Sequence, residues 1–341
     1  MAKNYDKQIE QDEDYDDIPF HYDYSEMMDI YAISPSGYIK DIEMISVAQE
    51  RLKNYGFTLT RDKTLGARYE RFAGTDEQRA LSFSRAALSD SPIVMASRGG
   101  YGLSKILPLI DWELLKKHPK KYCGFSDFTA FNLAYLAKTG LVSYSGPNLI
   151  TDFGREKIEL LNAELFTETM RGELEILNFE SEGSDPCDER GVLWGGNLCV
   201  MQQLLGTPYF PKVENGILFI EDVGEHPYRI ERNLVSLWQA GVFEHQKAII
   251  LGHFTEYQTT DYDNGFDMES VISWLRETTK LPIIKGLPYG HGDVRVTLPV
   301  GKEVGVATQE GMAYLLLEEH HHEESYLGQC EHDNCTCGQQ E

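Results

Sequence analysis

The chain has little basic charge, few cysteines and no long apolar run. Its 341 residues carry 31 Lys and Arg against 55 Asp and Glu, a formal net charge of −24. Such a balance would repel phosphate backbones, which excludes a nucleic-acid binder. No run of about 18 apolar residues occurs, so no membrane-spanning helix is predicted. The scattered Cys123, Cys187 and Cys199, and the absence of an apolar secretory segment near Met1, favour the reducing cytoplasm.

The acidic residues are concentrated at the two ends. Residues 1–29 carry a net charge of −8 and residues 318–341 a net charge of −7, so both are predicted to be solvated, disordered tails. The second tail also holds side chains that could bind a soft metal: His320, His321, His322, Cys330, His332, Cys335 and Cys337. Their spacing does not form the paired C-x-x-C pattern of zinc sites. The sequence therefore favours a tail without metal, and we expect no cofactor.

Between the tails, short apolar runs alternate with stretches of helical periodicity. In the first half, strands are predicted at 30–34, 92–97, 122–125 and 141–146, with helices between them. In the second half, strands are predicted at 192–196, 217–223 and 248–254, and helices at 228–240 and 268–279. This alternation predicts an α/β fold whose N-terminal layer is Rossmann-like or flavodoxin-like. The polar stretch 178–190 is predicted to link a domain at 30–177 to one at 191–317.

Ser126 follows a predicted strand and precedes a helix, within Gly124-Phe125-Ser126-Asp127-Phe128. This is the setting of a nucleophile elbow, in which a tight turn raises Oγ above the sheet. Phe128 stands where the elbow motif has its second glycine. A serine that merely caps the helix is the structural alternative.

Three further segments contain groups that could take part in catalysis, and each also has a purely structural explanation. The glycines of 98–102 could bring backbone amides to an oxyanion or could form an ordinary tight turn. Glu221 ends an apolar strand, where it could orient a base, simply be solvated or cap the helix that begins near Pro227. His291 lies in a turn, where it could be a base or an ordinary surface or core residue. Together, Ser126, His291 and Glu221 supply the nucleophile, base and orienting acid of serine-based acyl transfer.

From about Ile30 to about Leu317 the chain resembles the LD-carboxypeptidase family of serine peptidases, the muramoyltetrapeptide carboxypeptidases. The similarity is carried by SPSG (34–37), RFAGTDEQR (71–79), SRGGYGLSKILPLIDW (97–112), GFSDFTA (124–130), SGPN (145–148), LWGGNL (193–198), EDVGEHPYRIER (221–232), LGHF (251–254) and GLPYGHGDVRVTLPVG (286–301). These blocks are long and follow the family's order.

The resemblance implies an N-terminal α/β domain that carries the nucleophile Ser126. It also implies a smaller, β-rich C-terminal domain that carries the acid Glu221 and the base His291. The backbone N–H groups of Gly100 and Asp127 are the implied oxyanion donors. The implied reaction is release of the terminal D-alanine from murein tetrapeptides during cytoplasmic peptidoglycan recycling, by a homodimer that needs no metal. The substrate's free carboxylate could be held by Arg98 or Arg229, although either could equally form an ordinary ion pair.

Two alternatives remain open at this point. A microcin-immunity type of peptidase would cleave a peptidyl-nucleotide amide with the same three residues, stacking the base on an aromatic side chain. Residues 148–190 contain no Trp, but they do contain Phe153, Phe166 and Phe179. A non-catalytic ligand-binding module would explain the glycine loops but not the Ser, Glu and His blocks.

Overall fold

The computed structural model describes residues 26–318. Its first half forms a sheet from β1 (Met28–Ile33), β2 (Phe57–Arg61), β3 (Ile93–Ala96), β4 (Lys121–Gly124) and β5 (Ser143–Ser145). These five strands run parallel in the order β5-β4-β3-β1-β2. That is the flavodoxin-like, doubly wound arrangement, so the predicted N-terminal layer is confirmed.

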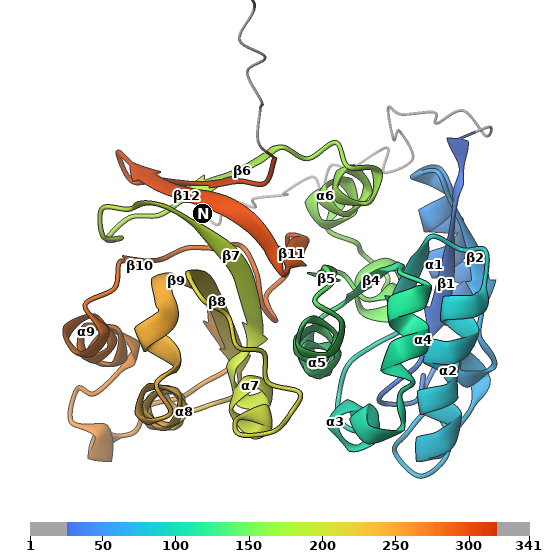
Figure 1. Cartoon of the computed structure of the whole chain (residues 1–341), viewed down its shortest axis with the longest axis horizontal. Coiled ribbons are helices and arrows are strands. Elements are labelled where there is room, and N and C mark those ends of the chain that lie inside the picture. Colours follow the sequence, from blue (N-terminus) through green and yellow to red (C-terminus); the bar gives the residue numbers. More distant parts are fainter. Residues whose placement is uncertain (1–25, 319–341) are drawn as a thin grey trace, which may run out of the picture.

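Helices connect these strands and surround the first sheet (Figure 1). They are α1 (Glu43–Asn54), α2 (Asp76–Leu88), α3 (Leu103–Ile106), α4 (Trp112–Lys117), α5 (Thr129–Thr139) and α6 (Leu160–Arg171). Short 3-10 turns lie at Lys63–Gly66, Leu107–Leu109 and Ser126–Phe128, and a π-helical turn lies at Leu149–Gly154. The α2 helix begins after Thr75, which forms a reciprocal capping box with Gln78.

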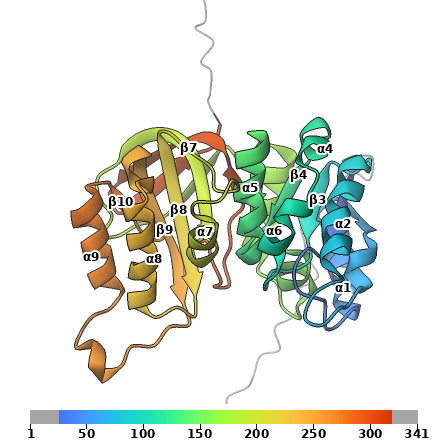
Figure 2. The ribbon, with the colours of Figure 1, turned by 60° about the horizontal axis from the view of Figure 1, so that its bottom comes forward.

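The second half forms a mixed sheet in the order β10-β9-β8-β7-β12-β13-β6. Its strands are β6 (Ile176–Glu180), β7 (Asp188–Asn197), β8 (Gly216–Val223), β9 (Gln246–Thr255), β10 (Ile283–Ile284), β12 (Lys302–Gln309) and β13 (Met312–Leu316). Strands β7 to β10 are parallel, and β12, β13 and β6 are antiparallel additions. The helices of this half are α7 (Leu198–Leu204), α8 (Pro227–Gln239) and α9 (Met268–Thr279), which lie side by side against the sheet (Figure 2). Two 3-10 turns lie at Val242–His245 and Asp261–Asp263.

The two sheets are joined by a strand that returns late in the chain. Strand β11 (Leu298–Val300) pairs antiparallel with β5 at the edge of the first sheet. Gly301 follows at once, and its N–H donates to Leu193 O in the second sheet at 2.7 Å. Helix α5 lies between the sheets (Figure 1), and one continuous core contains its Phe131 together with Phe219 of β8. The halves therefore share an apolar core, and the chain from β11 to Gly301 passes directly from the first sheet to the second.

Strands extend into two of the segments expected to lie outside the sheets. The stretch 178–190 contains the end of β6 and the start of β7, so the chain enters the second sheet at Ile176. The expected N-terminal tail, 1–29, includes the start of β1 at Met28. Residues 1–25 and 319–341, with the predicted tail cysteines and histidines, lie outside the described residues. Across residues 26–318, no helix combines the length and apolar character needed to span a membrane.

Candidate active site

Ser126 occupies a strained turn at the carboxyl end of β4. Its φ is +65°, a left-handed conformation that costs free energy for a residue with a side chain. The turn is tight because Gly124 has no side chain: a Cβ there would come within 2.7 Å of the Phe128 ring. Ser126 makes no side-chain cap to the 3-10 turn it begins or to α5, so the helix-capping alternative does not describe it. The backbone has the character of a nucleophile elbow.

The structure brings Ser126, His291 and Glu221 together from three distant segments. Ser126 Oγ lies 3.0 Å from His291 Nε2, and His291 Nδ1 lies 2.8 Å from Glu221 Oε2. Glu221 is fully buried, whereas the His291 side chain retains 20% exposure. A buried carboxylate that accepts from Nδ1 of a partly exposed imidazole can fix the tautomer that leaves Nε2 free to accept the serine proton.

Asn197, at the end of β7, holds the buried acid in place. Its Nδ2 donates to Glu221 Oε1 at 3.0 Å and to Asp222 Oδ1 at 3.1 Å. Asp222 also accepts from the backbone N–H groups of Cys199 and Val223. Burial, together with the neighbouring Glu221 charge, raises the pKa of Asp222 to about 6 despite the hydrogen bonds that lower it. Asn197 was not predicted to belong to the site, and its only signal in the sequence is its place in the LWGGNL block.

The glycine loop after β3 lies directly beside the serine. A Cβ on Gly99 would come within 2.8 Å of Ser126 Cβ and 3.4 Å of Asp127 N, so only glycine fits between them. Gly100 has φ +112°, a conformation that glycine adopts readily. The structure thus places the Gly99-Gly100 pair next to the start of the Ser126 turn. The roles of the Gly100 and Asp127 amides as oxyanion donors stay predictions.

The Asp127 side chain connects the loops that follow β1, β3 and β4 by hydrogen bonds. It accepts from Ser36 Oγ at 2.6 Å, after β1, and from Leu103 N at 2.9 Å, after β3. Burial raises the pKa of Asp127, while these two hydrogen bonds lower it. The loops that follow β1, β3 and β4 are therefore held as one unit.

The two arginines considered for carboxylate binding lie in different settings. Arg98 is partly buried next to Gly99; its Nη1 donates to Tyr38 O at 3.3 Å, and its Nε has no hydrogen-bond partner among the described residues. Arg229 is exposed on α8, with Nη1 3.9 Å from Glu225 Oε2 and Nε 3.2 Å from the Tyr228 hydroxyl. Arg98 adjoins the Ser126 turn through Gly99, whereas Arg229 has the contacts of a surface ion pair.

A second histidine, His253 in β9, packs under the loop that carries His291. Its backbone N–H donates to Tyr289 O at 2.8 Å, and a Cβ on Gly292 would come within 2.9 Å of its Nδ1. Burial lowers the pKa of His253, the nearby Glu221 raises it, and Arg295 lowers it. His253 was not predicted to have a role, although it lies in the LGHF block.

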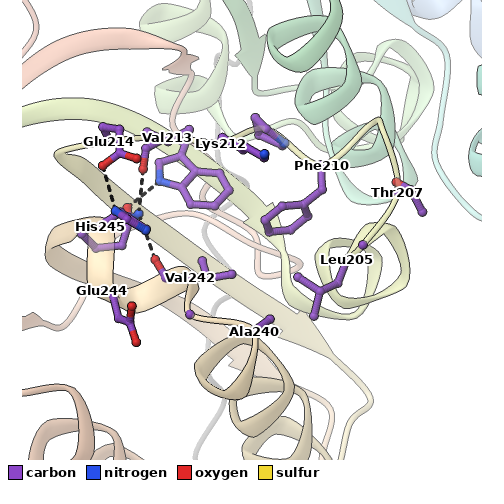
Figure 3. A pocket seen from close by; sticks show the side chains of 15 residues that line it. Leu205, Thr207, Phe210, Lys212, Val213, Glu214, Ala240, Val242, Glu244 and His245 are labelled. Carbon is purple, nitrogen blue, oxygen red and sulfur yellow. Dashed lines mark hydrogen bonds and ion pairs between the residues drawn. The ribbon is translucent and has the colours of Figure 1, made fainter.

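A cavity of about 500 Å³ lies at the opposite edge of the second sheet, near the start of β8 and β9 (Figure 3). Phe210 and Trp194 pack edge to face there with centroids 5.7 Å apart, and the His245–Glu214 ion pair closes one side. No predicted site residue lines this cavity. Within residues 26–318, no group of three or more His, Cys, Asp or Glu is arranged to hold a metal ion.

An α/β scaffold with Ser, His and Glu in hydrogen-bonded series is typical of hydrolases that act by nucleophilic attack. The chain belongs to the LD-carboxypeptidase family: the family's N-terminal domain matches residues 30–146 and its C-terminal domain matches residues 190–306.

Individual relatives are consistent with this assignment. A probable murein peptide carboxypeptidase of Bacillus subtilis is 30% identical over 280 residues, which cover 81% of this chain and 88% of that protein. The crystal structure of a muramoyltetrapeptide carboxypeptidase from Oxalobacter formigenes superposes with a TM-score of 0.80 at 40% identity, covering 84% of this chain and 98% of that one. The microcin C7 self-immunity protein of Escherichia coli is 27% identical over 288 residues, which cover 75% of this chain and 83% of that protein.

Proposed function

We propose that this protein is a serine LD-carboxypeptidase that releases the terminal D-alanine from murein tetrapeptides. The observation that carries the proposal is the hydrogen-bonded series from Ser126 Oγ through His291 to buried Glu221. The names of the Bacillus and Oxalobacter relatives support the murein substrate.

In the proposed mechanism, His291 accepts the proton of Ser126 Oγ, which attacks the carbonyl before the D-alanine nitrogen. Glu221 orients the imidazole and stabilises its protonated form. The N–H groups of Gly100 and Asp127 stabilise the oxyanion, each typically worth about 3–4 kcal/mol. His291 then protonates the departing amine as the C–N bond breaks, and water releases the acyl group from Ser126.

The proposal assigns the substrate's terminal carboxylate to Arg98 in preference to Arg229. Arg98 lies beside Gly99 and has no carboxylate partner among the described residues, which supports this choice, whereas Arg229 already has Glu225 nearby. A guanidinium beside the reacting serine could hold a carboxylate through two parallel hydrogen bonds.

Peptidyl-nucleotide amides are the competing substrate class, given the similarity to the microcin immunity protein. Base stacking would need an accessible aromatic ring in the segment after the first sheet. Phe153, Phe166 and Phe179 are 1%, 0% and 7% exposed, so none of them offers a free face. Their burial supports the murein substrate.

The domains at 30–177 and 191–317, the homodimer and the cytoplasmic recycling role stay predictions that accompany this proposal. In this proposal the substrate binds between the two domains, with Ser126 on one domain and Glu221 and His291 on the other.

The decisive experiment is mass spectrometry of D-alanine release from a muramoyl tetrapeptide by wild type and Ser126→Ala. Wild type should remove one alanine residue, and Ser126→Ala should lower the rate by at least about 10⁴-fold because the nucleophile is lost. Ser104→Ala, at a half-buried serine in α3, is the matched control and should retain wild-type activity. Cleavage of a peptidyl-nucleotide amide but not of the tetrapeptide would overturn the substrate, and equal activity of Ser126→Ala would overturn the mechanism.

A further inference from the structure

Arg295 donates hydrogen bonds to backbone carbonyls on both sides of His291. It lies four residues after His291 and is 4% exposed. Its Nε donates to Gly290 O at 3.0 Å, and its Nη2 donates to Gly292 O at 3.4 Å. Gly290 and Gly292 are the residues immediately before and after His291. A single rigid guanidinium therefore holds the carbonyls of the two residues that flank His291, and so fixes the loop that carries the imidazole.

Asp152 anchors that guanidinium from the other half of the molecule. Its Oδ1 pairs with Arg295 Nη1, and the two side chains are 2% and 5% exposed. Its Oδ2 accepts from Asn148 N at 2.8 Å. Asp152 lies in the π-helical turn Leu149–Gly154, an uncommon backbone form that is frequent at functional sites. Asn162 adds a further tie, because its Oδ1 accepts from Arg295 N at 2.6 Å.

The same guanidinium also contacts the residue that precedes the nucleophile. Arg295 Cζ lies 3.6 Å from the centroid of the Phe125 ring, a cation–π contact. The Phe125 ring is 5.2 Å from the His291 ring, and Phe125 N donates to Asn148 Oδ1 at 3.2 Å. Arg295 therefore packs at once against the serine turn and the histidine loop.

We propose that Arg295 and Asp152 are positioning residues. By linking the two halves of the molecule, they hold His291 Nε2 within hydrogen-bonding distance of Ser126 Oγ. Stability alone is a poor reason for such a pair, because a buried ion pair is often no better than apolar side chains of similar volume. Two of the guanidinium nitrogens of Arg295 instead donate to the carbonyls of Gly290 and Gly292, the residues on either side of the base. The inference rests on the proposed function, since it assumes that His291 activates Ser126.

The test compares Arg295→Ala, Arg295→Lys and Asp152→Asn with wild type. The matched control is Arg85→Ala, which breaks another pair between an arginine and a buried carboxylate, the one with Asp62 at 2.7 Å. Three quantities are measured: the melting temperature, kcat and KM for the tetrapeptide, and the rate at which a fluorophosphonate labels Ser126. In the labelling step an Oγ–P bond replaces the P–F bond, fluoride leaves and His291 accepts the serine proton. This rate therefore reports activation of Ser126 independently of the murein substrate.

Arg295→Ala should lower kcat and the labelling rate together by about 100-fold, with a much smaller change in KM, because the base is misplaced. Arg295→Lys should recover little, since an ammonium group lacks the planar fork that reaches both carbonyls. Ethylguanidinium should raise the labelling rate of Arg295→Ala, and ethylammonium should not. Arg85→Ala should have a lower melting temperature than wild type but the same kcat and labelling rate.

Wild-type kcat and labelling in folded Arg295→Ala, with only a lower melting temperature, would overturn the positioning role. If Arg295→Ala does not fold, Asp152→Asn, which preserves shape, decides in its place through the same loss of labelling. Wild type that is labelled at Ser126 but releases no D-alanine would overturn the murein substrate, while its labelling rates still test Arg295. Wild type that neither labels nor releases D-alanine would overturn both proposals.

Discussion

At the scale of single residues, the space beside Ser126 is set by a missing side chain. Gly99 is not in a left-handed conformation, so its backbone would accept alanine. The obstacle is the position of a Cβ, which would lie 2.8 Å from Ser126 Cβ and 3.0 Å from Ser126 Oγ. Because Ser126 is already held in a strained conformation, it has little freedom to move aside.

Gly99→Ala should therefore lower kcat for D-alanine release by about 10- to 100-fold, because Oγ is displaced from His291. Gly66→Ala is the matched control: a Cβ there meets nothing within 4 Å and its φ is not positive. That variant should retain full activity and a melting temperature equal to or slightly above wild type, since alanine restricts the unfolded chain. Steady-state kinetics and thermal melts of both variants check this expectation, and an active Gly99→Ala would contradict it.

At the scale of elements, the end of β8 places two acids side by side in a buried region. Glu221 faces His291 and Asp222 accepts three donors, yet both are almost fully buried. Burial outweighs those hydrogen bonds and raises the pKa of Asp222 from 3.8 to about 6. The folded protein therefore holds this proton more tightly than the unfolded chain does. The stability contributed by Asp222 must fall as pH rises from about 4 to about 6.

Asp222→Asn should remove this pH dependence. From the shift in pKa, the free energy of unfolding of wild type relative to Asp222→Asn should decrease by about 3 kcal/mol between pH 3.5 and pH 7. Asp90→Asn, at an exposed turn between α2 and β3, is the control and should show no such trend. Urea denaturation of the three proteins across that pH range makes the comparison. A difference that stays flat or grows with pH would rule out a raised pKa for Asp222.

At the scale of the whole molecule, the two halves are bound by more than a linker. Strand β11 belongs to the second half of the chain but completes the first sheet. The shared core joins Phe131 with Phe219, and Asn197 N donates to Thr129 Oγ1 at 3.0 Å across the boundary. Neither half can lose its structure without exposing apolar surface of the other.

The described part of the chain should consequently unfold in a single cooperative transition. Calorimetry, far-ultraviolet circular dichroism and loss of D-alanine release should give the same midpoint, because the site is built from both halves. Two resolved transitions, with activity lost in the first, would show that the halves fold independently despite the crossing strand.

Much of the local structure was predictable from the sequence. Strands with continuous apolar runs, such as 92–97 and 217–223, appear as β3 and β8, and the capping box at Thr75 begins α2. The elbow at Ser126 was also readable, because glycine, strand and helix signals lie within a few residues of it. Asn197, Asp152 and Arg295 were not recognised, since a polar residue that will be buried against a distant charge has the same local pattern as an exposed one.

The sequence by itself determined most of the elements, the alternation of strands and helices in the first half and the residue types available for acyl transfer, because those depend on periodicity and short-range turns. The tertiary structure alone decided that Ser126 and His291, 165 residues apart, meet at 3.0 Å. It also decided that β11 crosses back to the first sheet and that Arg295 reaches Asp152. Such contacts follow from strand order and from the packing of one buried surface on another, which no local pattern of residues specifies.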